Sequence, residues 1–108
     1  MDLQTVIDAM MTPEKVQPLE IRNYYMFLTS LYATHSITLC DALAISAGQE
    51  AILVTEGTTS SKAKQIVRGS ENGQTVIKLT GLLNAIEELI RSLKTAQKYH
   101  AEAGRNTF

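Results

Sequence analysis

The chain has 108 residues, of which 44% are hydrophobic and 19% charged, with two prolines and six glycines. This length is typical of one domain, and the composition excludes disordered and fibrous-repeat chains. The net charge of −1 gives no global attraction to nucleic acid or anionic membranes, and the single cysteine, Cys40, excludes a disulfide-stabilised secreted scaffold.

The charges divide unevenly along the chain. Residues 1–56 carry two basic and seven acidic side chains, a net charge of −5, whereas residues 57–108 carry eight basic and four acidic side chains, a net charge of +4. We therefore expect the two halves to attract each other, either within one folded chain or between neighbouring copies.

Residues 1–18 are expected to form short helices. Asp2 can cap a helix whose apolar residues have helical spacing. Pro13 and Pro18 each suit the first turn of a new helix. A long central helix is then expected over 19–56, because no glycine or proline lies between Leu19 and Ala47. Gly57 suits its C-terminal cap.

A break in this helix is the competing interpretation. The stretch from His35 is poor in strong helix formers, and Thr38 to Asp41 matches a capping box, so the helix could end near residues 35–38 and restart. The product would be a compact bundle that buries its own core. The absence of a glycine or proline at this point favours the continuous helix.

Apolar residues surround the central helix for much of its length. A seam with spacings of three and four includes Tyr25, Leu28, Tyr32, Leu39 and Leu53, and further apolar residues lie outside it. The helix would be about 57 Å long at 1.5 Å per residue, whereas a compact chain of this size has a radius of gyration of about 13 Å. The uncovered apolar surface is therefore expected to contact other copies or a partner.

A connector over 57–75, a C-terminal coiled-coil-like helix over 76–103 and a tail over 104–108 complete the single α-helical domain. The last helix repeats leucine and isoleucine at coiled-coil spacing between Leu79 and Leu93. Asn72-Gly73 is also a hairpin signal, so a short β-hairpin around residues 64–79 stays open. The predicted fold is all-α, an elongated helical hairpin or bundle.

Residues 23–40 contain no formal charge unless His35 is protonated. Seven of these eighteen residues are polar, and no excess of basic residues flanks the run. Burial against protein is therefore expected in preference to insertion into a membrane.

Few residues suggest chemistry. His35 and Cys40 lie about 140° apart on a helix, so their side chains diverge, and a core histidine beside a small buried cysteine is expected. His100 is expected to solvate a helix end. Glu87 can pair with Arg91, and the adjacent glutamates are expected at the surface. We predict no catalytic, cofactor-binding or metal-binding residues, no small-molecule substrate and no enzymatic activity.

A basic stretch could contact phosphates or a partner, although no aromatic residue is interleaved with it and nucleic acid is the less favoured occupant. Its side chains are Lys62, Lys64, Arg68 and Lys78.

The resulting hypothesis is a non-enzymatic structural protein that self-associates through apolar helices, as a component of a phage or other viral particle would. The expected interface consists of Tyr25, Leu28, Tyr32, Leu39, Ala44, Ala47, Ala51, Leu53, Leu79, Leu82, Ile86, Leu89 and Leu93. A small helical adaptor, chaperone or inhibitor that binds another protein is the alternative, and a nucleic-acid-binding helical protein is the weaker one. The acidic start predicts no signal peptide, so a cytoplasmic or particle location is expected.

Overall fold

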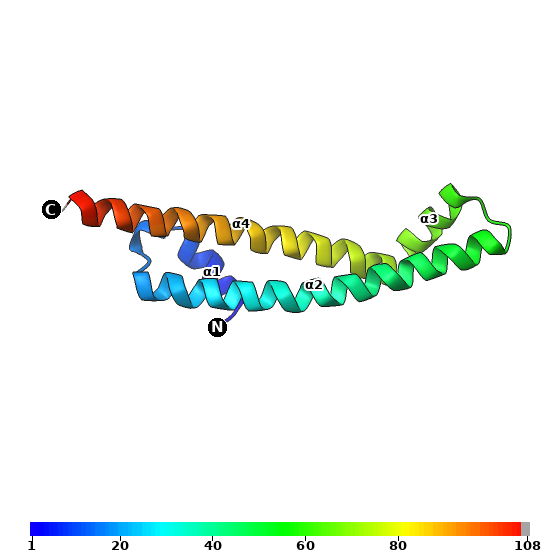
Figure 1. Cartoon of the computed structure of the whole chain (residues 1–108), viewed down its shortest axis with the longest axis horizontal. Helices are drawn as coiled ribbons and strands as arrows, with labels where there is room; N and C mark the ends of the chain where they lie inside the picture. Colours follow the sequence, from blue (N-terminus) through cyan, green and yellow to red (C-terminus); the bar gives the residue numbers. More distant parts are fainter. Residues whose placement is uncertain (107–108) are drawn as a thin grey trace. The chain divides into compact units, whose positions relative to one another are not determined.

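The computed structural model describes the backbone of residues 1–106 and the side chains of residues 1–102. The described residues form helices and no strands (Figure 1). The elements are α1 (Leu3–Met10), the 3-10 helix η1 (Pro13–Lys15), α2 (Pro18–Thr55), α3 (Ser60–Gly69) and α4 (Glu71–Asn106). The prediction of an all-α hairpin with a long central helix and a long C-terminal helix is confirmed.

The N-terminal segment forms the short helices that its capping residues predict. Asp2 caps α1, because its carboxylate accepts a hydrogen bond from the Thr5 backbone N–H at 2.8 Å. This hydrogen bond lowers the pKa of Asp2. Pro13 then starts η1, and Pro18 starts α2.

Local hydrogen bonds explain where α2 begins and where it ends. At the start, the Glu20 carboxylate accepts from the Gln17 N–H at 3.3 Å, which is the reciprocal half of a capping box. At the end, Gly57 adopts a positive φ of 100°. Its N–H donates to the Val54 carbonyl at 3.1 Å, and the Thr58 N–H donates to the Leu53 carbonyl at 3.0 Å. These two bonds form a Schellman cap, as Gly57 predicts.

The helix α2 continues through residues 35–38, so the predicted alternative of a break there is wrong. Thr38 does not cap a new helix. Its hydroxyl instead donates to the Thr34 carbonyl one turn earlier, at 3.2 Å. Thr29 and Thr55 bond back to their own helix in the same way. Because these hydroxyls find hydrogen-bond acceptors within α2, the helix can continue through a stretch of weak helix formers.

Residues 64–79 belong to α3 and α4, so the predicted alternative of a β-hairpin is wrong. Thr59 caps α3 by accepting from the Lys62 N–H at 3.4 Å. The single residue Ser70 separates the two helices, and its hydroxyl accepts from the Gly73 N–H at 3.1 Å. Because Ser70 caps α4, that helix begins at Glu71, earlier than the predicted start at residue 76.

The C-terminal end of α4 also differs from the prediction. The helix continues through Gly104 to Asn106, past the predicted end at residue 103. Residues 107 and 108 of the predicted tail lie outside the described residues.

The chain divides into two compact units. The first contains Met1–Ala33 and the chain from Asn84 onward, and the second contains Thr34–Leu83. Within each unit a part of α2 runs alongside a part of α4, with α1 in the first unit and α3 in the second (Figure 1). The described core of the first unit consists of Val6, Val16, Ile21, Tyr24, Leu28, Ile86, Leu93 and Ala96. The core of the second consists of Ala42, Ala63, Val67 and Leu83.

Candidate interaction surfaces

In each unit a polar contact joins α2 to α4. In the first unit the Tyr32 hydroxyl donates to the Glu87 carboxylate at 2.8 Å. In the second, the Asn72 amide donates to the Ala42 carbonyl and to the Ser46 hydroxyl, both at 2.8 Å. These bonds fix how the two helices pair within each unit, because sliding either helix would leave part-buried polar groups without partners.

The contact with Tyr32 corrects two predictions about the glutamates. Glu87 is half-buried against α2, not at a solvated surface, and it does not pair with Arg91. Arg91 pairs instead with Glu88, three residues away, and both side chains of that ion pair are exposed. Exposed pairs contribute little to stability, at most about 1 kcal/mol. The hydrogen bond between α2 and α4 is the more specific interaction.

Titration of Tyr32 is expected to reveal the Glu87 contact. The hydrogen bond to the Glu87 carboxylate, together with its negative charge, raises the pKa of Tyr32 above the ordinary value of 10.0. A raised pKa in the folded state favours the neutral phenol, so this contact stabilises the fold below the unfolded pKa. The stabilisation is lost as pH rises through the folded pKa.

An NMR titration of ring-labelled tyrosine checks this expectation, with Tyr32→Phe assigning the resonance. Glu87→Gln should bring the pKa of Tyr32 back toward its ordinary value. The same midpoint for Tyr32 in the wild type and in Glu87→Gln would contradict the contact.

The predicted interface residues of the first unit are mostly inside it. Leu28, Ile86 and Leu93 are fully or almost fully buried against their own chain, so they stabilise this unit and present no surface to another molecule. Tyr32 and Leu89 are half-buried. Tyr25 is 43% exposed and lies at the edge of a groove described below.

In the second unit, in contrast, the predicted interface residues are half-buried or exposed. Leu39, Leu53, Leu79 and Leu82 are half-buried, and Ala44, Ala47 and Ala51 are exposed. Seven large apolar side chains of this unit are exposed, whereas four apolar side chains are buried and two of those are alanines. We call the exposed apolar residues of α2 in this unit the outer α2 surface; they are Ile37, Leu43, Ala44, Ile45, Ala47, Ala51, Ile52 and Val54.

The structure also shows where the two histidines and the cysteine lie. His35 is half-buried and Cys40 is exposed, so the prediction of a buried cysteine is wrong. The reason is that α2 is covered by its own chain on one side, and Cys40 lies on the other. His100 does more than solvate a helix end. Its Nε2–H donates to the Val16 carbonyl, and its ring makes an edge contact with the Tyr99 ring at 5.7 Å.

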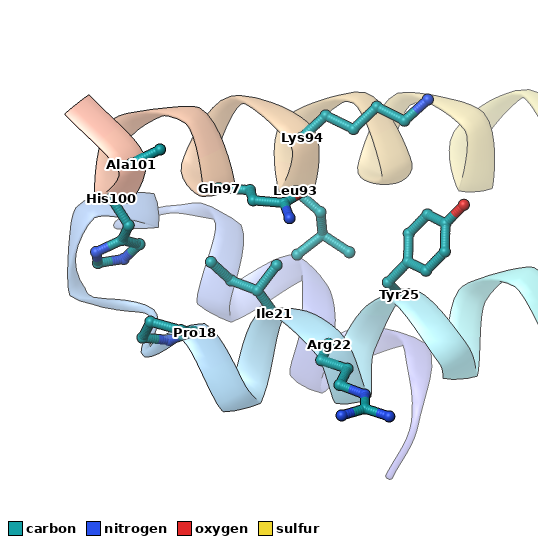
Figure 2. A pocket seen from close by; sticks show the side chains of 9 residues that line it. All are labelled: Pro18, Ile21, Arg22, Tyr25, Leu93, Lys94, Gln97, His100 and Ala101. Atoms are coloured by element: carbon teal, nitrogen blue, oxygen red, sulfur yellow. The ribbon is translucent and has the colours of Figure 1, made fainter. Parts of the chain in front are cut away.

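A groove of about 650 Å³ lies between α2 and α4 in the first unit. We call it the first-unit groove; its lining residues are Pro18, Ile21, Arg22, Tyr25, Leu93, Lys94, Gln97, His100 and Ala101. Figure 2 shows Ile21 and Leu93 pointing toward each other from the two helices, whereas the side chains of Arg22 and Lys94 extend away from the space between the helices. The lining includes two basic side chains, Arg22 and Lys94, and no carboxylate.

Two smaller grooves lie in the second unit. One, of about 410 Å³, is lined by Lys64 and Arg68 from α3 and also by Glu50 from α2. Lys62 and Lys78, the other two residues of the predicted basic stretch, are exposed but do not line it. The structure therefore brings two of the four basic residues together, beside an acidic side chain.

The third groove, of about 290 Å³, is lined by Ile52 and Leu53 of α2 and by Ile66 of α3, among others. Gln49 also lines it, and the Gln49 Oε1 atom is buried without a hydrogen-bond donor among the described residues. Buried amide oxygens usually have a partner. The walls of this groove are mostly apolar.

Among the described residues, one helix, α2, is long and apolar enough to cross a membrane by length and composition. Almost none of the residues in its most apolar window are buried within the chain. Core helices of soluble proteins and signal sequences share this length and composition.

Within the described part of the chain, no group of three or more His, Cys, Asp or Glu side chains could hold a metal ion. Comparison with protein-family models, with curated proteins and with solved structures finds no match to this chain.

Proposed function

We propose that this chain is a non-enzymatic structural subunit that self-associates through the outer α2 surface. The proposal depends on one observation: in the second unit, large apolar side chains lie on the outside and mostly small ones lie in the interior. Ile37 is 66% exposed and Ile52 is 59% exposed, whereas the interior of this unit holds two alanines, one valine and one leucine. A phage or viral particle is the kind of assembly expected from the sequence.

Covering the outer α2 surface would supply the stabilisation that the second unit lacks internally. Full burial of a valine, leucine or isoleucine side chain contributes about 1.5–3 kcal/mol. Five such side chains are exposed on the outer α2 surface. Because these side chains are already about half covered, burying the rest contributes on the order of 5 kcal/mol per copy, which lies at the lower end of the estimated cost of association, about 4–15 kcal/mol. Self-association is therefore favourable when the contact buries such apolar side chains from both copies.

The residues between the large side chains allow close approach. Ala44, Ala47 and Ala51 are exposed and lie among the isoleucines, so a second helix could pack against this part of α2 at a short interaxial distance.

Ala47→Glu is expected to disperse the assembly. The substitution places a carboxylate on the outer α2 surface, and burying an unpaired charge in an apolar contact costs several kcal/mol. Size-exclusion chromatography with light scattering should give a mass of several chains for the wild type and a much smaller mass for Ala47→Glu. Ala85→Glu is the matched control, because Ala85 is also exposed but lies on α4 in the first unit.

Two other outcomes of this experiment would count against self-association or in favour of the adaptor alternative. A wild-type chain that stays monomeric at every concentration would contradict self-association. If that monomer bound a hydrophobic dye and lost it on adding another protein, the adaptor alternative would replace the proposal. An assembly through apolar packing should also persist at high salt, because screening weakens only the charge interactions.

A further inference from the structure

We infer that the outer α2 surface of one copy packs antiparallel against the first-unit part of α2, residues 19–33, of a second copy. This inference rests on the proposed function and names the segment that covers the outer α2 surface. In a pair of copies related by a two-fold axis the same contact forms twice, because each copy offers both parts of α2.

The first-unit part of α2 has an exposed stripe without charged residues. Its residues alternate at spacings of four and three, which is the spacing of a coiled-coil seam. They are Leu19, Asn23, Met26, Ser30 and Ala33. Leu19 is 68% exposed and Met26 is 59% exposed, so these side chains are available to another copy and are not part of the core of their own unit. Because the solvated side of a helix is normally charged, this stripe is typical of a surface that another helix covers.

The second-unit part of α2 has an exposed, uncharged stripe with the same spacing. Its residues are Ile37, Cys40, Ala44, Ala47 and Ala51. The two stripes differ in size, since the first contains leucine and methionine and the second contains three alanines. The exposed side of α4 is a poorer match for either stripe, because it carries Glu88, Arg91 and Lys94. The uncharged stripe of α2 from a second copy is therefore the better cover.

An antiparallel alignment places large side chains opposite small ones. The facing pairs, with the residue of the second copy given second, are Leu19–Ala51, Asn23–Ala47, Met26–Ala44, Ser30–Cys40 and Ala33–Ile37. Facing positions that alternate in size interdigitate and leave few voids. A parallel pair in register would instead place each alanine opposite the same alanine, and the space left between the helices would weaken the contact. Side-chain size therefore favours the antiparallel pair.

The charges beside the stripes favour the same alignment. It brings Arg22 beside Glu50 of the second copy. The Arg22 side chain extends away from the space between α2 and α4 (Figure 2), and it forms no ion pair among the described residues. Glu50 is half-buried and also lacks an ion pair within the described part of its own chain. Exposed ion pairs add little affinity, so this pair selects the alignment, and a shift by one heptad would separate the two charges.

The contact is large enough for a specific pair. In a two-fold pair each copy contributes both stripes, which together contain ten residues. With the flanking residues, roughly 20 residues of each copy take part, which is at the lower end of the about 20–30 residues per side in stable interfaces. Such a pair can serve as the repeating unit of a larger assembly.

Disulfide trapping tests the alignment. Ser30→Cys places a thiol opposite Cys40 of the second copy, so mild oxidation of the assembled protein should link most chains into covalent dimers. The wild type should not cross-link, because its two Cys40 residues would lie about 15 Å apart along the helices. Asn23→Cys is the matched control, since its thiol would lie in the same stripe but about 10 Å from Cys40 of the second copy. Electrophoresis without reducing agent measures all three proteins.

Arg22→Glu tests the charge pairing separately. It places like charges beside each other in both contacts of the pair, so association at low salt should weaken about tenfold. Lys94→Glu is the control, because it makes the same change in net charge at an exposed residue of α4 in the same unit, and it should associate like the wild type. Sedimentation velocity measures both variants. Equal weakening by the two variants would overturn the pairing of Arg22 with Glu50.

The outcomes of trapping separate this inference from the proposed function. A wild type that assembles, together with Ser30→Cys that cross-links no faster than Asn23→Cys, would overturn the antiparallel contact and leave self-association standing. Rapid cross-linking of the wild type through Cys40 would show a parallel pair and would overturn the alignment in the same way. A wild type that does not assemble in light scattering would overturn both.

Discussion

Replacing Gly73 with alanine is expected to destabilise the second unit by about 1–3 kcal/mol, although alanine is the better helix former by about 1 kcal/mol. A Cβ atom at Gly73 would lie 2.1 Å from the Val67 carbonyl oxygen and 2.6 Å from the Arg68 carbonyl oxygen. Both atoms belong to the backbone at the end of α3, so no side-chain rotation can make room. The last turn of α3 and the first turn of α4 would have to separate.

Gly81→Ala is the matched control for this prediction. Gly81 lies in the same helix and the same unit, and a Cβ atom there would meet nothing within 4 Å. It should therefore stabilise the protein by about 0.5–1 kcal/mol through helix propensity. Urea unfolding followed by circular dichroism measures both variants. A Gly73→Ala protein as stable as Gly81→Ala would show that α3 and α4 do not approach so closely.

Local chemistry predicts most helix boundaries in this chain. The cap at Asp2, the restarts at Pro13 and Pro18, and the glycine cap at Gly57 are each specified by one residue and its near neighbours in sequence. Interactions that span three to five residues can be read from the sequence, because the partners are always present at those spacings.

Interactions between distant residues are what the sequence could not predict. Asn72 has the hairpin signature with Gly73, but its amide binds Ala42 and Ser46, thirty and twenty-six positions away. Gly73 serves the close approach of α3 and α4, not a turn with positive φ. The backbone environment does require a glycine at position 73, but the reason is the contact with α3 and not the hairpin turn that the local sequence indicates.

Seam spacing alone could not separate the chain's own core from a surface for partners. Leu28 and Ala47 were both expected at the self-association interface, yet Leu28 is buried within the first unit and Ala47 is exposed in the second. The spacing of three and four describes which side of a helix is apolar, not what covers it. That distinction depends on how much of each helix its own partners cover.

Leu28→Ala is expected to destabilise the first unit by about 2–5 kcal/mol. Leu28 is 0% exposed, so its removal loses the transfer free energy of the side chain and leaves a cavity. The loss is a large fraction of the total stability of a small domain. Urea unfolding should be compared at one fixed protein concentration, because self-association adds to the apparent stability.

Met26→Ala separates this effect from the general loss of an apolar side chain. Met26 lies two residues earlier in α2 and is 59% exposed, so its removal should change stability by less than about 0.5 kcal/mol. Light scattering on the same samples, under conditions where both variants are folded, should show Leu28→Ala assembling to the wild-type mass. A Leu28→Ala protein with unchanged stability but reduced assembly would mean that Leu28 contacts another copy instead of its own core.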